Sequence, residues 1–321
     1  MINRIKNSLT NPVFAGLIAI FCCALWGSAF PAIKTGYAVL DIQADDYFSQ
    51  ILFAGIRFTL AGVLTIFIGS ALAKKPLSVK GKSSFKNVAI LSLFQTILQY
   101  LLFYVGLART TGTKGSILTS SSVFFAVIIA SVILKQERLT AKKLVGAVIG
   151  FAGVVLINLR TGDVSSSFSL MGEGFMILSA LSYAVSSVLI KSFSKNNNPV
   201  ALSGYQFVLG GIVMTVTGLV FGGKVGFNSV QAVLILIYLA LLSAIAYTLW
   251  GVLLKYNDVS KIAVYSFMTP VFGCLLSALF LHESLAGNLV KTLVSLALVC
   301  TGISLVNFKE KNNFREKKYE S

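Results

Sequence analysis

The recurrence of apolar blocks, each about twenty residues long, constrains this chain more than any other feature of its sequence. A helix needs about that length to cross roughly 30 Å of hydrocarbon, and a helix satisfies its own backbone hydrogen bonds inside a bilayer. Hydrophobic residues make up 56% of the 321 positions and charged residues only 12%, which is not the composition of a soluble chain. The sequence therefore predicts an all-α integral membrane protein.

Ten such blocks follow one another, each bounded by Gly, Pro, Asn or charged residues. They run over approximately 13–36, 48–72, 87–107, 114–134, 142–159, 170–192, 199–221, 229–254, 259–281 and 287–307. We predict ten transmembrane helices in two five-helix halves. The chain then divides into an N-terminal segment 1–12, a first half 13–160, a Ser-rich connector 161–169, a second half 170–307 and a charged tail 308–321.

The basic residues between the blocks predict the orientation. Cytoplasmic connectors of membrane proteins carry an excess of Lys and Arg. Twenty of these residues lie in the terminal segments and in alternate connectors, whereas the opposite set holds only six, namely Lys34, Arg109, Lys114, Arg160, Lys224 and Lys291. We therefore expect both termini in the cytoplasm and a multi-pass protein of the cytoplasmic membrane.

The two halves carry a sparse internal repeat. At an offset of 146 positions the matched residues are Ser120, Ser131, Glu137, Leu139 and Val148 with Ser266, Ser277, Glu283, Leu285 and Val294. Because five is an odd number, two related five-helix halves must lie in the bilayer with opposite orientation, a symmetry that lets a central site open to each face in turn. A duplication retained only for packing is the alternative.

Several functions are disfavoured by what the blocks and connectors contain. The net charge of +16 lies in short connectors and not on one amphipathic face, which argues against nucleic-acid binding. The one histidine, His282, lies at a block end, and we see neither paired Asp nor metal-ligand spacing. The four cysteines all lie inside apolar blocks. We therefore expect no enzymatic activity, no metal and no cofactor.

Motifs at the block ends carry a family resemblance. The first block contains Trp-Gly-Ser-Ala-Phe-Pro from Trp26 and ends at Lys34, and the second contains Gly-Ile-Arg-Phe from Gly55. Glu-Arg-Leu begins at Glu137, and a Glu-Ser-Leu lies thirteen residues after Pro270. In order and spacing these motifs resemble the EamA-type transporters of the drug/metabolite transporter superfamily, over roughly residues 13–307. One departure is Phe124, which stands where the second half has Pro270.

This resemblance implies a secondary transporter that moves a small metabolite across the cytoplasmic membrane by alternating access, with export as the favoured direction. The first block holds no Asp or Glu, so we expect an amino acid or a related neutral, zwitterionic or anionic compound and not a lipophilic cation. A drug or toxic-compound efflux carrier and a channel-like facilitator are the alternatives. The expected partners are the substrate and the lipid bilayer, with no nucleic acid; a homodimer stays open.

Polar and aromatic side chains at membrane depth are the candidate substrate contacts. Gln95 and Gln99 are one helical turn apart and share a face, and unpaired amides are costly in hydrocarbon. An amphipathic ring offers a substrate an apolar wall and a hydrogen-bonding group. Inter-helix hydrogen bonding, close packing of Ser and interfacial belts of aromatics are the competing explanations. The candidates are Trp26, Ser28, Gln95, Gln99, Ser121, Tyr183, Tyr247, Trp250 and Tyr265.

Four charged residues and two prolines complete the predicted site. Arg57 lies well inside the second block, where a cation is a functional candidate by default. We favour a structural role in which it donates to carbonyls near the outer end of that helix, with direct contact to the substrate as the alternative. For Lys34 we favour snorkelling to the interface. Glu137 and Glu283 end the fourth and ninth helices. Pro31 and Pro270 each remove a backbone donor, so we expect a helix break at each.

Overall fold

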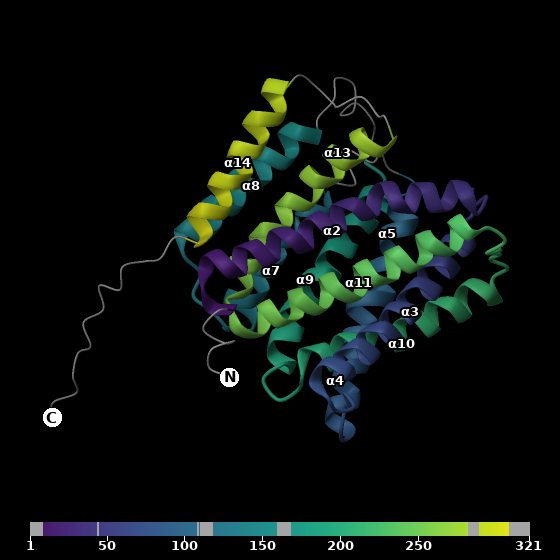
Figure 1. The fold of residues 1–321 in the computed structure, drawn as a ribbon. Helices are drawn as coiled ribbons and strands as arrows, with labels where there is room; N and C mark the ends of the chain where they lie inside the picture. Colours follow the sequence, from purple (N-terminus) through teal and green to yellow (C-terminus); the bar gives the residue numbers. More distant parts are fainter. Residues whose placement is uncertain are drawn as a thin grey trace.

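The structure is a computed structural model of the chain, and residues 9–43, 45–107, 109, 118–158, 168–281 and 289–307 are described (Figure 1). Helix occurs in each of the ten predicted blocks, and none of these residues forms a strand. The first half contains α2 (Pro12–Val39), α3 (Tyr47–Ala73), α4 (Lys82–Ser92), η1 (Leu93–Leu98), α5 (Gln99–Leu107), α7 (Ser122–Ile128), η2 (Ile129–Ile133) and α8 (Ala141–Asn158).

The second half contains η3 (Leu170–Gly174), α9 (Phe175–Phe193), α10 (Pro199–Val220), α11 (Val230–Tyr256), α12 (Val259–Ala263), η4 (Val264–Phe267), α13 (Met268–Leu281) and α14 (Leu289–Asn307). Six helical segments of the described chain are long and apolar enough to cross a membrane, and two further apolar helices are shorter. The chain is therefore an all-α membrane protein with several spanning helices.

Two helices begin at the same local sequence, Asn-Pro-Val. The side chain of Asn11 accepts a hydrogen bond from the Val13 amide at 3.0 Å, and that of Asn198 accepts one from the Val200 amide at 2.9 Å. An Asn N-cap satisfies a backbone amide of the first turn that has no partner within the helix. The proline at the first helical position has no amide hydrogen of its own to satisfy. The helices α2 and α10 therefore begin where the sequence places Asn-Pro.

The third and fourth helical segments each contain a π-helical stretch. The stretch η1 joins α4 to α5, and η2 follows α7 directly. One extra residue per hydrogen-bonded turn widens the helix and rotates the side chains that follow, and such bulges are frequent at functional sites. In the segment Lys82–Leu107, η1 lies immediately before Gln99.

Helices of the two halves pack in pairs. A Cβ added to Gly55 of α3 would lie 2.4 Å from the Thr215 amide nitrogen, and one added to Gly211 of α10 would lie 2.4 Å from the Thr59 amide nitrogen. Position 55 meets 215 while position 59 meets 211, so α3 and α10 run antiparallel. The small residues allow close contact between the two backbones.

The helices α8 and α14 pair in the same way and lie side by side in Figure 1. A Cβ added to Gly146 would lie 2.7 Å from a side-chain methyl of Val306, and one added to Gly153 would lie 2.7 Å from the Ser295 carbonyl. Position 146 therefore meets 306, and position 153 meets 295, which is again an antiparallel register.

The remaining helices cross between these two pairs. In the first half, α2 packs against α11 and α13 of the second half; in the second half, α9 packs against α5, η1 and α7 of the first half. The middle of the bundle is therefore built where α2, α9 and α11 meet the segment η1–α5.

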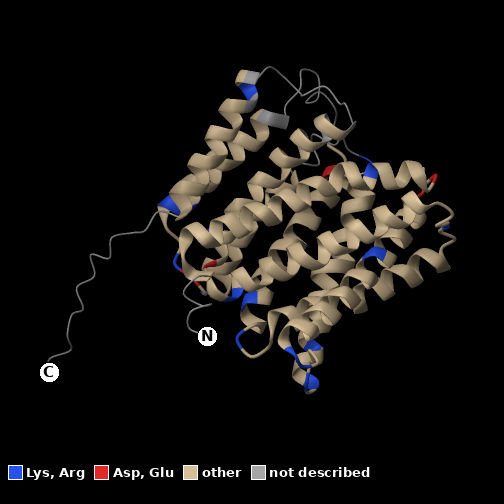
Figure 2. Cartoon of the chain, in the orientation of Figure 1, with Lys and Arg blue, Asp and Glu red and all other residues tan. Residues whose placement is uncertain are grey.

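The Lys and Arg residues gather mainly at helix ends toward the bottom and left of Figure 2.

Candidate functional site

A group of aromatic rings lies where these central helices meet. The indole of Trp26 on α2 lies 4.9 Å from that of Trp250 and 5.1 Å from the ring of Tyr247, both on α11. Its centroid is 6.3 Å from that of Tyr183 on α9, and all three contacts are edge-on. Edge-to-face contacts over these distances are favourable. Four of the predicted substrate contacts are therefore brought together.

Tyr100 on α5 completes this group. Its hydroxyl lies 2.6 Å from the Tyr247 hydroxyl, so one of the two donates to the other. We call Trp26, Tyr100, Tyr183, Tyr247 and Trp250 the aromatic cluster; its members come from α2, α5, α9 and α11.

Several polar atoms of this region are buried without a hydrogen-bond partner among the described residues. They are the indole nitrogens of Trp26 and Trp250, the Tyr183 hydroxyl, and the amide oxygens of Gln95 and Gln99. Buried polar groups are normally satisfied, because each orphaned group costs about 1–3 kcal/mol. Three of these atoms belong to rings of the aromatic cluster, which both halves supply, and polar groups among apolar rings are the pattern of a small-molecule site.

Serines of α9 hold the π-helical stretch of the third segment in place. The Ser182 hydroxyl donates to the Phe94 carbonyl at 2.7 Å, and the Ser179 hydroxyl donates to the Gln99 carbonyl at 2.8 Å. A π turn leaves backbone carbonyls available for such donors. These bonds fix the segment that carries Gln99 and Tyr100 against the helix that carries Tyr183.

Arg57 lies beside the aromatic cluster and is 3% exposed. Its Nε and one Nη donate to the Ser243 hydroxyl on α11 at 3.1 and 2.9 Å, in place of the carbonyls that we expected. The Ser243 hydroxyl in turn donates to the Leu239 carbonyl at 2.9 Å. The guanidinium carbon also lies 5.0 Å from the centre of the Phe58 ring.

Three predicted contacts lie away from the aromatic cluster. The Ser28 hydroxyl is 2.6 Å from that of Tyr238 on the exposed side of α11. The Ser121 hydroxyl donates to the Leu118 carbonyl within its own turn. Tyr265 lies in the 3-10 turn η4, and its hydroxyl is close to Gly16 near the start of α2.

The predicted helix breaks take different forms. Pro31 lies inside α2, which continues as α-helix to Val39, so the predicted break is a single missing donor and not an interruption. Pro270 is the third residue of α13 and directly follows the 3-10 turn η4, where the helical geometry does change. Glu283 lies outside the described residues, and Lys34, which is exposed, has a polar interaction within the described chain.

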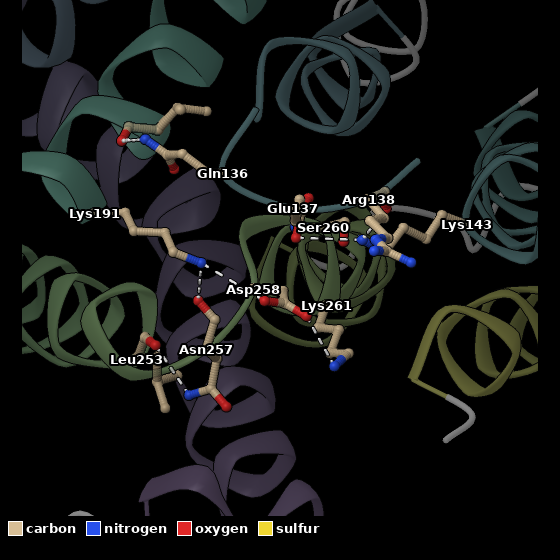
Figure 3. Close-up of polar contacts among 11 residues, drawn as sticks. Gln136, Glu137, Arg138, Lys143, Lys191, Leu253, Asn257, Asp258, Ser260 and Lys261 are labelled. Atoms are coloured by element: carbon tan, nitrogen blue, oxygen red, sulfur yellow. Dashed lines mark hydrogen bonds and ion pairs between the residues drawn. The ribbon is translucent and has the colours of Figure 1, made fainter. Parts of the chain in front are cut away.

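A network of polar contacts joins the two halves at the end of the bundle that carries Glu137 (Figure 3). One carboxylate oxygen of Glu137 accepts a hydrogen bond from the backbone amide of Ser260 on α12 at 3.1 Å. The other oxygen is 3.4 Å from the Lys143 ammonium on α8. The Gln136 amide donates to the Ser192 hydroxyl of α9 at 2.5 Å. The connector after η2 is therefore tied to three other elements.

Lys191 and Asp258 form a second part of this end. The Lys191 ammonium donates to the Asn257 carbonyl at 2.7 Å and lies 3.8 Å from the Asp258 carboxylate, which in turn is 2.9 Å from the Lys261 ammonium. Burial alone would raise the pKa of the Asp258 carboxyl, but Lys261 and then Lys191 outweigh it, so that the pKa is lowered below its ordinary value. Asp258 therefore stays ionised.

The first and last described residues are attached to the same region. The Asn257 amide donates to the Leu9 carbonyl just before α2 at 3.0 Å, and the Asn307 amide donates to the Lys261 carbonyl at 3.2 Å. We call this set the polar end network: Leu9, Gln136, Glu137, Lys143, Lys191, Ser192, Asn257, Asp258, Ser260, Lys261 and Asn307.

Two surface pockets of the described chain open at this end. One, of about 440 Å³, is lined by residues that include Leu9, Lys195 and Lys255, and the other, of about 70 Å³, by residues that include Lys261 and Tyr265. Neither is lined by a member of the aromatic cluster. These two pockets therefore do not reach the aromatic cluster.

Sequence reasoning missed three residues of this arrangement. Tyr100 follows the predicted Gln99 directly and was visible as a polar aromatic in an apolar block. Asp258 stands three residues before Lys261, a spacing that favours an ion pair. Ser243 carries no local signal, because its role comes from Arg57, which is 186 positions away.

Comparison with known proteins agrees with this architecture. The profile of the EamA-like transporter family matches residues 13–159 and again 170–308. A solved crystal structure shares the fold, with a TM-score of 0.75 at 20% sequence identity over 91% of this chain and 96% of that chain.

Curated relatives are similar over nearly the whole length. A chloroplastic WAT1-related protein of Arabidopsis thaliana is 28% identical over 90% of this chain and 68% of its own. A transporter of Archaeoglobus fulgidus is 30% identical over 83% of this chain and 89% of its own, and the transporter YvbV of Bacillus subtilis is 26% identical over 92% of each. The family and these names indicate a transporter and not an enzyme. The chain belongs to the EamA-like transporter family.

Proposed function

We propose that this protein is a secondary transporter that carries a small metabolite across the cytoplasmic membrane by alternating access, with the aromatic cluster as its substrate site. The observation that carries the proposal is the set of unpartnered polar atoms buried among rings of α2, α5, α9 and α11. A substrate bound there would contact both halves at once. Its binding would therefore be sensitive to their relative position, which is what coupling to a conformational change requires.

The packing pattern supports two inverted halves within ten spanning helices. The first helix of each half packs against the third or fourth of the other: α2 against α11 and α13, and α9 against α5 and α7. The second helices, α3 and α10, pair antiparallel, and so do the fifth, α8 and α14. Exchanging the halves leaves this pattern unchanged, which is expected when both halves share one fold in opposite orientation.

The polar end network gives the mechanism a closed side. It holds the connector after η2 against the start of α12, and thus one half against the other, at the end where the basic connectors gather. The excess of Lys and Arg supports a cytoplasmic location for that end and for both termini. In our proposal substrate enters from the cytoplasm when the network opens and leaves on the opposite side when it closes again.

The surroundings of the aromatic cluster favour a neutral, zwitterionic or anionic substrate, such as an amino acid. The acidic residues of the ion pairs given above, Glu137 and Asp258, lie at the polar end network and not at the cluster. A cationic substrate would therefore find neither of these carboxylates at the cluster. We propose export as the direction, following the resemblance of the sequence motifs. Drug efflux and channel-like conduction are the alternatives that the experiment below distinguishes from it.

Comparative metabolite profiling tests this function even though the substrate is unidentified. Cells that overexpress the protein are compared with cells that express Trp26→Ala to the same level, and metabolites are measured in medium and cytosol. An exporter enriches specific small metabolites in the medium, and Trp26→Ala abolishes the enrichment. Identical profiles for both variants across the metabolome would overturn the assignment of the site. Non-saturating flux of the enriched compound into vesicles would point to a channel.

A further inference from the structure

The proposed site has one buried charge at its edge, the guanidinium of Arg57. Arg57 is the eleventh residue of the 27-residue apolar helix α3. At 1.5 Å per residue its Cα lies about 15 Å from one helix end and about 24 Å from the other. Its side chain is 3% exposed. The guanidinium is therefore at membrane depth, where a charge is costly unless it is paired.

The protein offers this cation only partial compensation. Both of its hydrogen bonds go to a single neutral acceptor, the Ser243 hydroxyl. A guanidinium has five N–H donors, and it forms no ion pair with a described acidic residue; the described carboxylate partners, Glu137 and Asp258, pair with lysines instead. The face of Phe58 contributes a weaker cation–π contact.

Arg57 is also connected to the substrate site by consecutive ring contacts. The Phe58 ring lies 4.5 Å from that of Tyr100 and 5.2 Å from that of Phe207, and Phe207 lies 5.0 Å from Tyr247. Ser243, the partner of Arg57, precedes Tyr247 by one turn of α11. The cation is thus placed at the edge of the aromatic cluster.

We infer that Arg57 determines specificity by binding a carboxylate of the transported substrate. This inference rests on the proposed transport function and deepens it. The guanidinium fork matches a carboxylate, and such charge-assisted bonds are about twice as strong as neutral ones. The neighbouring groups, two indole N–H groups and the tyrosine hydroxyls, can also donate to substrate oxygens. The substrate is then a small carboxylate, either an apolar acid or a zwitterion such as an amino acid.

The chain contains its own reporter for this binding. Its only two tryptophans are Trp26 and Trp250, and their rings are in contact inside the aromatic cluster. Intrinsic tryptophan fluorescence of the purified full-length protein therefore reports on this site alone. The probes are pairs of compounds that differ only in carboxylate against primary amide: L-leucine and L-leucinamide, L-phenylalanine and L-phenylalaninamide, phenylacetate and phenylacetamide. Phenylphosphonate serves as a non-carboxylate anion.

The expected result is a saturable fluorescence change with at least one carboxylate and an affinity for its amide that is at least about tenfold weaker, the order expected for loss of a charge-assisted bond. Arg57→Met should abolish this difference, and Arg57→Lys should retain part of it. Arg109→Met, which removes an exposed cation stacked on Tyr47, should leave it unchanged. Comparing acid with amide on the unmodified protein keeps the test valid even if Arg57→Met does not fold.

Two outcomes separate this inference from the transport function. If carboxylates and amides bind equally well, or phenylphosphonate alone binds, the inference is overturned, while saturable exchange of the same compounds in vesicles would leave the transport function intact. If no compound exchanges saturably and none alters the fluorescence, both fail. A structural role for Arg57 predicts that Arg57→Met lowers thermal stability and weakens acid and amide alike.

Discussion

The carboxylate of Glu137 accepts a hydrogen bond from the backbone amide of Ser260, a residue 123 positions away in the other half of the chain. The same carboxylate lies 3.4 Å from the Lys143 ammonium, and both side chains are almost fully buried. Breaking a buried pair by removing one partner is costly, because the remaining charge is left uncompensated. The contact of Glu137 with Ser260 is therefore suited to hold the two halves together at one end in the conformation in which it is formed.

Removing this contact should expose the interior to the basic end. Cys23 of α2 is 0% exposed and its thiol lies 3.2 Å from the Tyr265 carbonyl, beside the segment that Ser260 precedes. In a variant that keeps Cys23 as its only cysteine, we expect Glu137→Ala to increase the rate of its modification by a small water-soluble thiol reagent several-fold. Glu137→Gln, which retains an oxygen for Ser260, should have a smaller effect.

The matched control for this measurement is Asp45→Ala, which removes an exposed acid in the connector between α2 and α3. Its rate should equal that of the parent variant. Equal rates for Glu137→Ala and the parent, with both proteins folded, would mean that the network does not close this end.

Asp258 should stabilise the protein in a pH-dependent way. Because its pKa is lowered in the folded protein, its contribution is fully present above the ordinary carboxyl range, near about pH 4, and is lost as the pH falls through the lower folded value. The pair with Lys261 is partly exposed, so the contribution is at most about 1 kcal/mol. Thermal unfolding of wild type and Asp258→Asn should differ at pH 7 and converge below about pH 4. A difference that grows on acidification would contradict this assignment.

Truncating Tyr183 of the aromatic cluster, or Gln99 next to Tyr100, should impair transport and not folding. The Tyr183 hydroxyl and the Gln99 amide oxygen have no described partner, so neither Tyr183→Ala nor Gln99→Ala removes a structural hydrogen bond from these atoms. We expect each to reduce the initial rate of substrate exchange by about tenfold, the effect of removing one hydrogen bond or ring contact. Expression and monodispersity should be unchanged. Unchanged flux of both variants for every substrate tested would place the site elsewhere.

The paired small residues of α3 and α10 should be equally intolerant of a methyl group. A Cβ at Gly55 or at Gly211 would lie 2.4 Å from a backbone nitrogen of the facing helix. The helices must therefore separate, at a cost of about 1–3 kcal/mol. Both Gly55→Ala and Gly211→Ala should lower the thermal unfolding temperature in detergent. Gly226→Ala, whose new methyl would meet only the side chain of Asn228, should be close to neutral; equal stability of all three would argue against this packing.

Much of the fold follows from the sequence because the bilayer requires long helices. The predicted block 199–221 became Pro199–Val220, and 170–192 became the segment Leu170–Phe193. The π-helical stretch Leu93–Leu98 was not predictable, because its carbonyls are satisfied by serines of α9 that are distant in sequence. Likewise, the effect of Pro31 depends on the helices around α2 and not on the proline alone.

The site was predictable as a set of residue types but not as an arrangement. Trp26 and Ser28 are two positions apart and so point to opposite sides of α2; the structure turns Trp26 inward and Ser28 toward Tyr238. The helical period shows that both cannot face the cluster, whereas only packing decides which one does. Tyr265 could not be placed, because it follows the change from α-helix to 3-10 helix at Val264.

Counterflow in proteoliposomes tests the central claim, a carrier with one site that alternates between the two faces. Vesicles that contain the purified protein are loaded with an excess of unlabelled substrate from the metabolite profile and diluted into a trace of labelled substrate. We predict transient accumulation of label above its external concentration, saturable with substrate and abolished by Trp26→Ala. Simple equilibration of label, at a rate that rises linearly with concentration and is unaffected by Trp26→Ala, would contradict this claim.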